Sequence, residues 1–297
     1  MQMRTTLFTL AIALLACGTT LAASTNTTVS ASNKWAWSSS SGWLNCRTDI
    51  TNGVAVGEYV LSGYMYSPTI GWIHLGDGTP TNGVRYCNNS AVDYGVNHDG
   101  AGHLSGYAWG PSAGWINFGW TNQDAPQAPK INLQNGMFSG YAWGASVGWI
   151  SLSNISAKLQ TVKLTTGPNE DNDGIPDAWE IQWTGSTNLL RAGLDYDGDG
   201  YADEQEYILD TCPTNPADAL DFAGIVMSGG TNFCISWFGR PTRFYRIEKK
   251  NDLMEPYWAD SGLGWFVGLS DSAVTCAIPC SASTQGFFRL RAARPLP

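Results

Sequence analysis

Oxygen-bearing side chains repeat with one spacing in two twelve-residue stretches near the middle of the 297-residue chain. In both stretches they fall at positions 1, 3, 5, 9 and 12, with glycine at position 6 and a residue at position 7 that can offer its backbone carbonyl. The first stretch supplies Asn169, Asp171, Asp173, Ile175, Asp177 and Glu180, and the second supplies Asp195, Asp197, Asp199, Tyr201, Asp203 and Glu206. Calcium is a hard cation that takes about six to eight oxygen ligands in a flexible shell. We therefore expect two Ca²⁺ sites.

The charge around these stretches favours metal binding over a solvated acidic linker, which is the alternative interpretation. Residues 169–221 hold fourteen acids and one base, Arg191, whereas the whole chain has a net charge of −9. Two like charges about 4 Å apart repel by roughly 4 kcal/mol at an effective dielectric of about 20. Without a cation we therefore expect loose loops. No basic stripe is visible in the sequence, which argues against a nucleic-acid partner.

These stretches and the residues after them resemble a known repeat family. The motifs DNDGIPDAWE, DYDGDGYADEQEY and DTCPTNPAD are similar to the calcium-binding repeats of thrombospondin type 3 and of many bacterial secreted proteins, over about residues 165–220. The resemblance implies that the residues named above are the ligands, in loops of EF-hand type. Gly167 and Pro168 leave no helix entering the first loop, which favours a structural calcium staple over a regulatory sensor. We expect short helices at 178–183 and 203–209.

The N-terminal residues predict export. Residues 1–23 combine a positive charge, an apolar stretch and a small-residue end, which is typical of a secretory signal peptide. Cleavage near Ala22 or Ala23 is the first expectation, and the alternative is a lipid anchor at Cys17, because residues 14–17 resemble a bacterial lipobox. We expect no transmembrane helix, since no other segment is apolar enough to span a bilayer. The expected location is therefore secreted or cell-surface.

The cysteines predict disulfides. Six cysteines follow residue 23, and an even number in an exported chain favours pairing. Cys46 and Cys87 stand apart from the others, so we expect them to pair with each other. Three connectivities remain open for the other four, which are Cys212, Cys234, Cys276 and Cys280.

Residues 24–160 contain four similar segments, at 35–44, 64–73, 107–116 and 141–150. Each has two aromatic residues separated by one position, then a short turn-like stretch, then Gly-Trp. This alternation predicts hairpins or three-stranded meanders in a repeat-built antiparallel β domain. Residues 110–114 and 144–148 match the Gly-X-Ser-X-Gly pattern of hydrolase nucleophiles. Because the pattern recurs at equivalent positions of the segments, we interpret both as turns.

Nine of the fourteen tryptophans lie in these N-terminal residues, and two interpretations compete. The rings can fill the core of a glycine-rich sheet domain, or they can lie exposed in a row and stack on sugars. The regular spacing favours the core. Trp120, which lies outside the repeated pattern, is the best single candidate for an exposed ring.

The C-terminal residues, 222–297, alternate apolar and polar side chains as β-strands do. The pattern CISW…RFYRIEKKNDL…FFRLRA loosely resembles a fibronectin type III module, which implies a small β-sandwich. The expected fold class is therefore mainly β, with a signal peptide (1–23), a β-repeat domain (24–160), a calcium-binding segment with small helices (161–221) and a sandwich (222–297). We expect a non-enzymatic calcium-binding structural or adhesive protein, with a cell-surface protein or a glycan as partner. The alternative is a carbohydrate-binding module that uses exposed tryptophans.

Overall fold

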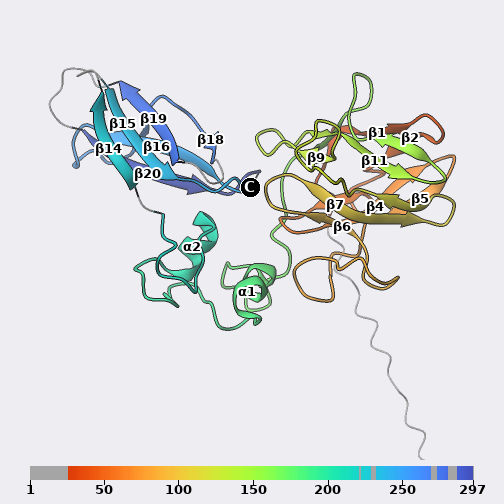
Figure 1. Cartoon of the computed structure of the whole chain (residues 1–297), viewed down its shortest axis with the longest axis horizontal. Coiled ribbons are helices and arrows are strands. Elements are labelled where there is room, and N and C mark those ends of the chain that lie inside the picture. Colours follow the sequence, from red (N-terminus) through yellow and green to blue (C-terminus); the bar gives the residue numbers. More distant parts are fainter. Residues whose placement is uncertain (1–25, 221, 229–231, 269–272, 280–285, 297) are drawn as a thin grey trace, which may run out of the picture.

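The computed structural model describes residues 26–220, 222–228, 232–268, 273–279 and 286–296. These residues form a mainly β protein with antiparallel sheets and two short helices. Figure 1 shows a barrel of N-terminal strands, two C-terminal sheets, and the helices α1 and α2 in the segment that connects them. Neither helix is long and apolar enough to cross a membrane. The predicted signal peptide and Cys17 lie outside the described residues.

Eight strands close into a barrel, because the last of them pairs with the first. They form four hairpins, one at each tryptophan-rich segment: β1 (Val29–Ser38) with β2 (Gly42–Asn45), β4 (Leu61–Ser67) with β5 (Gly71–His74), β7 (Leu104–Gly110) with β8 (Gly114–Asn117), and β11 (Tyr141–Gly144) with β12 (Gly148–Ser151). Shorter strands extend this sheet: β3 (Val54–Val56), β6 (Val96–His98) and β13 (Leu159–Thr161). A separate pair consists of β9 (Lys130–Ile131) and β10 (Phe138–Ser139).

All four hairpins share one register. In the third, Trp109 lies opposite Trp115 and Gly110 lies opposite Gly114, and the other three hairpins pair the equivalent positions. Each turn ends at a glycine with a positive φ, which is 67° at Gly114 and 64° at Gly148. Such a φ favours glycine because other residues carry a Cβ that clashes there. The segments 110–114 and 144–148 are therefore hairpin turns, as the sequence predicts.

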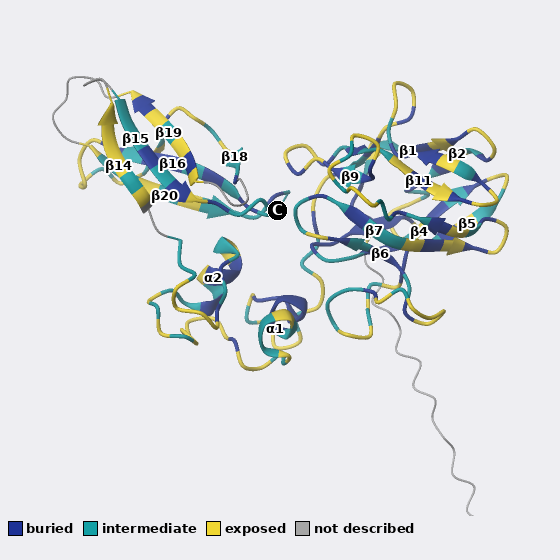
Figure 2. Cartoon of the chain, in the orientation of Figure 1, coloured by how far each residue is buried: buried dark blue, intermediate teal, exposed yellow. Residues whose placement is uncertain are grey.

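The interior of the barrel is aliphatic, so the expectation of a tryptophan core is wrong. The inward positions of the hairpins are fully or almost fully buried, and they are Ala36, Leu44, Met65, Ile73, Ala108, Ile116, Ala142 and Ile150. Ala113 and Val147, in two of the turns, close one end of this core. Figure 2 shows the alternation of buried and exposed residues along the barrel strands. The tryptophans occupy the exposed positions of that alternation, because small and branched side chains already fill the interior.

The structure also contradicts the predicted disulfide between Cys46 and Cys87. Cys46 is 1 % exposed inside the barrel core, where burial raises the pKa of its thiol to about 12. Cys87 is exposed on a loop, and both cysteines are free. The described cysteines Cys212, Cys234 and Cys276 are free as well, and Cys280 lies outside the described residues.

The acidic segment folds around a small core of its own. Helix α1 (Asp177–Thr184) follows the first acidic stretch and α2 (Asp203–Leu209) follows the second, as expected. Ile175, Trp179, Leu190 and Tyr207 are 0–2 % exposed and form one cluster. The rings of Trp179 and Tyr207 lie 5.7 Å apart, so the two helices are packed together through aromatic side chains.

The C-terminal residues form two antiparallel sheets around one cluster. One sheet holds β14 (Phe222–Ser228), β15 (Asn232–Phe238) and β19 (Ala273–Pro279). The other holds β16 (Phe244–Lys250), β17 (Ala259–Asp260), β18 (Phe266–Val267) and β20 (Phe287–Ala293). Trp237 of the first sheet contacts Tyr245 and Phe266 of the second, with ring centroids 6.0 and 5.5 Å away.

Candidate metal centre and aromatic surface

The second acidic stretch is folded into a loop whose carboxylates converge. Asp195, Asp197 and Asp199 place one carboxylate oxygen each within 4.8 Å of the others, so this group could hold a metal ion. Asp195 accepts hydrogen bonds from the backbone N–H groups of Gly198 and Gly200, at 2.7 and 2.9 Å. Gly200 has a φ of 100°, which allows the sharp turn expected at position 6. The loop is thus held in shape by its own backbone.

A buried glutamate closes each loop at position 12. Glu180 and Glu206 are both 0 % exposed. Both carboxylate oxygens of Glu180 and Oε2 of Glu206 lack a hydrogen-bond partner within the described part of the chain. Burial, with Asp173 and Asp171 nearby, raises the pKa of Glu180 to about 7, and burial, with Asp197 and Asp199 nearby, raises that of Glu206 to about 8. A buried carboxylate beside other acids is costly unless a cation balances it.

The first stretch has the same internal hydrogen bonds. Asp171 accepts from the N–H of Asp173 at 3.3 Å, and Asp173 accepts from the N–H of Ile175 at 2.8 Å. The second loop repeats these bonds two positions apart, from Asp199 to Asp197 and from Tyr201 to Asp199. Asn169 at position 1 has a buried Oδ1 without a partner among the described residues. The first loop therefore shares two backbone bonds with the second, whereas the three converging carboxylates are found only in the second loop among the described residues.

The aspartates at position 9 accept backbone hydrogen bonds in the structure, and their role as metal ligands stays a prediction. Asp177 accepts a hydrogen bond from the N–H of Glu170, at 2.9 Å. Asp203 accepts from the N–H groups of Arg191 and Tyr196, at 2.7 and 3.0 Å, so both of its oxygens are bonded to backbone. These two aspartates shape their loops in the structure. At position 7, Ile175 anchors its loop with a fully buried side chain, and the backbone carbonyls of Ile175 and Tyr201 remain predicted ligands.

The helix that carries Glu206 also joins the three parts of the chain. The hydroxyl of Tyr207 donates to the Glu58 carboxylate, at 3.0–3.1 Å, between α2 and the barrel. Arg294, directly after β20, donates to that hydroxyl at 2.6 Å and to Glu58 at 3.1 Å. Arg243 donates to the carbonyls of Tyr207 and Ile208, at 2.7 and 2.9 Å. We call the group of Glu58, Tyr207, Arg243 and Arg294 the joint.

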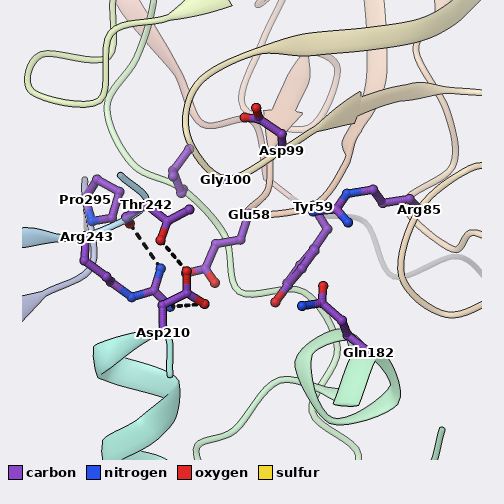
Figure 3. Close-up of a pocket in the computed structure, with 11 residues that line it drawn as sticks. Glu58, Tyr59, Arg85, Asp99, Gly100, Gln182, Asp210, Thr242, Arg243 and Pro295 are labelled. Carbon is purple, nitrogen blue, oxygen red and sulfur yellow. Dashed lines mark hydrogen bonds and ion pairs between the residues drawn. The ribbon is translucent and has the colours of Figure 1, made fainter. Parts of the chain in front are cut away.

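A cavity of about 70 Å³ lies at this joint (Figure 3). Glu58 and Tyr59 line it from the barrel side, Asp210 follows α2, and Arg243 comes from the turn before β16. Asp210 is paired with Arg243 and accepts a hydrogen bond from Thr242. Ligand pockets usually enclose about 300–1,000 Å³. This cavity is too small for a sugar or a cofactor, so we assign its residues to the contact between the parts.

The outer face of the barrel carries three aromatic rings on each of the four hairpins, and we call it the aromatic belt. Its members are Trp35, Trp37, Trp43, Tyr64, Tyr66, Trp72, Tyr107, Trp109, Trp115, Tyr141, Trp143 and Trp149. Their exposure reaches 54 % at Trp149 and 46 % at Trp115. Within every hairpin the first ring meets the Gly-Trp indole edge to face, with centroids 5.9–6.3 Å apart. Such contacts fix the rings in place.

Trp120 is half-buried, like Trp35 and Tyr66 and unlike the other ten belt rings, so the expectation that it is the most exposed ring is wrong. Its indole N–H donates to the carbonyl of Tyr141 at 3.0 Å, and its ring lies 5.8 Å from that of Trp149.

The sequence prediction also missed a polar residue two positions after each Gly-Trp tryptophan. These residues are Asn45, His74, Asn117 and Ser151. Their recurrence in all four segments was the available signal. The joint residues carried no such signal, since they come from distant positions.

The chain was compared with protein-family models, curated proteins and solved structures. No family model, no curated protein and no solved structure matches the chain.

Proposed function

We propose that the chain is an exported, non-enzymatic calcium-binding protein with a structural or adhesive role, in which Ca²⁺ staples residues 161–221 into a rigid connection. The observation that carries this proposal is the pair of fully buried glutamates, Glu180 and Glu206, whose unpartnered oxygens face the acids of their own loops. A cation between them would balance charges that otherwise repel.

The donor set favours calcium among the common cations. All proposed ligands are oxygens from carboxylates, one amide and two carbonyls. Zinc prefers nitrogen and sulfur, and magnesium keeps several waters in a rigid octahedron. We propose affinities of about 10⁻⁴ to 10⁻³ M, the range of extracellular calcium modules. The resemblance to thrombospondin type 3 repeats at about 165–220 is part of this proposal.

The wider architecture in this proposal is a chain of modules at or outside the cell surface. We propose a signal peptide at 1–23 and a fibronectin type III-like sandwich at 222–297. We also propose that the barrel arose from four copies of one hairpin unit. The joint supports a stapling role for calcium, because Glu206 and Tyr207 are consecutive residues of α2 and Tyr207 contacts both neighbouring parts.

Chelation tests this proposal. With millimolar Ca²⁺, the purified full-length protein is expected to resist proteolysis between residues 165 and 220 and to melt at a higher temperature than after addition of EDTA. Readdition of Ca²⁺ should restore both properties, and Mg²⁺ should restore them less. Identical melting and cleavage with and without the chelator would refute the staple.

A second candidate function, carbohydrate binding, is favoured by the exposure of the aromatic belt. Rigid aromatic rings offer contact area at a low cost in conformational entropy. Titration of intrinsic tryptophan fluorescence with a panel of soluble polysaccharides tests it. We expect a saturable change in intensity or wavelength with at least one member, and a flat response to all of them would remove this candidate.

A further inference from the structure

The aromatic belt is divided by the junctions between neighbouring hairpins, and each junction sets a ring beside a polar side chain. At three of them the strand pairs place Asn45 opposite Tyr66, His74 opposite Trp109, and Asn117 opposite Trp143. At the fourth, Trp37 lies opposite Ser151. Directly opposite residues on paired strands have Cβ atoms about 4.5–5.5 Å apart. A ring and a polar group are therefore adjacent at every junction.

Two of these junctions keep a free hydrogen-bond donor. The Oδ1 atom of Asn45 accepts the N–H of Arg47 at 3.0 Å, and that of Asn117 accepts the N–H of Gly119 at 2.6 Å. These equivalent bonds orient both amides. Neither Nδ2 group has a partner among the described residues, and both asparagines are partly exposed. Each amide can therefore donate to a ligand that lies on the neighbouring ring.

The other two junctions are already occupied by the protein. His74 is bonded through Nδ1 to the hydroxyl of Tyr94 at 2.8 Å and lies under the ring of Tyr64, 4.7 Å away. Ser151 is 6 % exposed and its hydroxyl donates to the carbonyl of Ser153 at 3.1 Å. The polar groups of these two junctions are therefore already engaged by neighbouring residues of the chain.

We propose that the barrel carries two equivalent binding sites for an uncharged polysaccharide, one at Trp43, Asn45 and Tyr66 and the other at Trp115, Asn117 and Trp143. In each site a pyranose ring lies with its C–H face on an indole or phenol ring, and the asparagine Nδ2 donates to a sugar hydroxyl. This inference rests on the carbohydrate-binding candidate above and adds the location, the number and the ligand class of its sites.

The charge of the surface selects the ligand class. In the four barrel hairpins, the paired positions that face outward hold aromatic residues, asparagine, histidine and serine. None of these paired positions is Asp, Glu, Lys or Arg. The net charge of −9 does not describe this surface, because residues 169–221 alone hold fourteen acids and one base. The ammonium of Lys34 lies over the Trp35 ring, 5.6 Å from its centroid, so an anionic polymer would meet one cation beside the first site and none among the residues of the second. A neutral polymer with alternating C–H and hydroxyl surfaces matches rings beside amide donors.

The shape of the barrel argues against a second copy of the chain as the occupant. The belt continues around a closed barrel, from β1 through β12 and back to β1. A second rigid copy could cover only one sector of this convex surface. A polysaccharide chain needs only one junction, and its repeating units suit equivalent sites. The sites are four strands apart in an eight-stranded barrel, so they lie on opposite sides.

Opposite sites would let one protein molecule bridge two polysaccharide chains. Bridging raises overall binding through effective concentration, without any new contact. It would also give the adhesive role a physical basis, because the barrel itself would be the cross-linker. A variant that keeps only one of the two sites should bind a polysaccharide chain without linking it to another.

The experiment uses the full-length, calcium-loaded protein with hydroxyethylcellulose, glucomannan, laminarin and, as a charged arm, alginate. Affinity electrophoresis measures binding, and solution viscosity measures cross-linking. We expect wild-type protein to bind at least one neutral polymer, equally in 50 and 500 mM NaCl, and to raise its viscosity. Trp143→Ala and Tyr66→Ala should each weaken binding about two- to fivefold and abolish the rise in viscosity, and the double variant should lose binding at least tenfold.

Matched variants separate the outcomes. Asn117→Ala is expected to weaken the second site about three- to tenfold, as loss of one hydrogen bond does. Trp265→Ala removes an indole that is 39 % exposed outside the barrel and should bind as wild type. Trp143→Phe, which keeps a ring, replaces Trp143→Ala if the latter melts early.

Binding that survives in the double variant overturns the site assignment but leaves carbohydrate binding standing. Absence of binding to every neutral polymer overturns both, as does binding to alginate alone or self-association in the absence of polymer.

Discussion

At the scale of single residues, the proposed calcium sites depend on carboxylates that the fold buries beside one another. Glu206 is fully buried in the described structure, whereas Glu170, at position 2 of the first loop, is exposed. Both carry the same charge. Only Glu206 is placed where a cation would be coordinated, so the two residues form a matched pair for testing charge against position.

Glu206→Gln is expected to lower the melting temperature in 10 mM Ca²⁺ and to leave it equal or higher in EDTA. With calcium at ten times its dissociation constant, a site stabilises the fold by about 1.4 kcal/mol, and the variant loses this. In EDTA the substitution removes a buried charge that repels its neighbours. Differential scanning fluorimetry measures both conditions. Glu170→Gln should melt like the wild type in both, and an equal effect of the two substitutions would contradict the assignment.

His98 predicts a loss of barrel stability in mild acid. It is fully buried and its Nδ1 donates to the carbonyl of Gly57 at 2.9 Å. Burial lowers the pKa of His98, an effect that the hydrogen bond to Gly57 and the charge of Asp99 oppose and that Arg85 and His103 reinforce. Since the unfolded chain takes up its proton at a pH of about 6.5, the free energy of unfolding falls as pH drops below that value.

Urea denaturation at pH 7.5 and 5.5 checks this expectation. Wild type should have a lower midpoint at pH 5.5. His98→Asn, whose amide can still donate to Gly57, should show a smaller difference between the two pH values. His103→Gln removes a partly exposed histidine paired with Asp99, whose effect on the pKa of His98 is the smallest of those named, and should reduce the difference much less than His98→Asn does. An unchanged difference in His98→Asn would assign the pH dependence to other groups.

At the scale of the elements, the sequence predicts where the hairpins lie but not which side of them is buried. The Gly-Trp glycines and the two-residue alternation locate the turns and strands, as in β7 and β8. Alternation separates Trp109 and Ala108 onto opposite faces without saying which face is inside. Closure into an eight-stranded barrel decides this, because its narrow interior takes Ala108 beside Ile116 and leaves no room for indoles. Closure is a long-range property that the local pattern does not contain.

The same limit applies to the acidic loops. Their position-6 glycines, their helices and the buried position-12 glutamates follow from the spacing. The spacing does not predict that Asp177 and Asp203 accept backbone hydrogen bonds. Those bonds depend on how the backbone of Glu170, Arg191 and Tyr196 folds back against the two carboxylates. The spacing of such a loop thus identifies which residues carry oxygen ligands, but it does not say which way each carboxylate points.

Two glycines of the third hairpin should differ in their tolerance of a side chain. A Cβ on Gly106 would lie 2.3 Å from the carbonyl oxygen of Gly95, whereas a Cβ on Gly114 would meet only Ser146 Oγ, at 3.9 Å. Both glycines have a positive φ. We expect Gly114→Ala to cost about 1–2 kcal/mol through backbone strain alone. Gly106→Ala should cost about 1–3 kcal/mol more, since the backbone must also shift. Urea denaturation followed by tryptophan fluorescence measures both, and equal costs would contradict the close approach.

At the scale of the whole molecule, the joint makes residues 161–221 the common neighbour of the barrel and the C-terminal sheets. Arg294 reaches back to Glu58, and Leu296 accepts a backbone hydrogen bond from Leu164 at 2.8 Å. The chain therefore returns to the barrel at its C-terminal end, as Figure 1 shows. Loss of order in α2 would remove Tyr207 from between Glu58 and Arg294, so we expect the proposed metal binding and the contacts of the joint to be coupled.

Tyr207→Phe tests this coupling. The variant keeps the ring in its cluster but leaves the Glu58 carboxylate with one hydrogen-bond donor fewer, at a cost of about 1–3 kcal/mol. We expect faster tryptic cleavage within residues 165–220 in the presence of Ca²⁺. Tyr196→Phe, at a residue that is 49 % exposed, serves as the control and should be cut at the wild-type rate. Equal cleavage of both variants would show that the joint does not depend on this hydroxyl.

Isothermal titration of the demetallated, full-length protein with CaCl₂ measures directly whether the two acidic loops bind calcium. We expect saturable uptake of two Ca²⁺ ions per chain at millimolar concentrations or below, reduced to one ion in Glu206→Gln and unchanged in Glu170→Gln. Titration to saturating calcium with no heat of binding, or with the same uptake in Glu206→Gln as in wild type, would contradict this expectation.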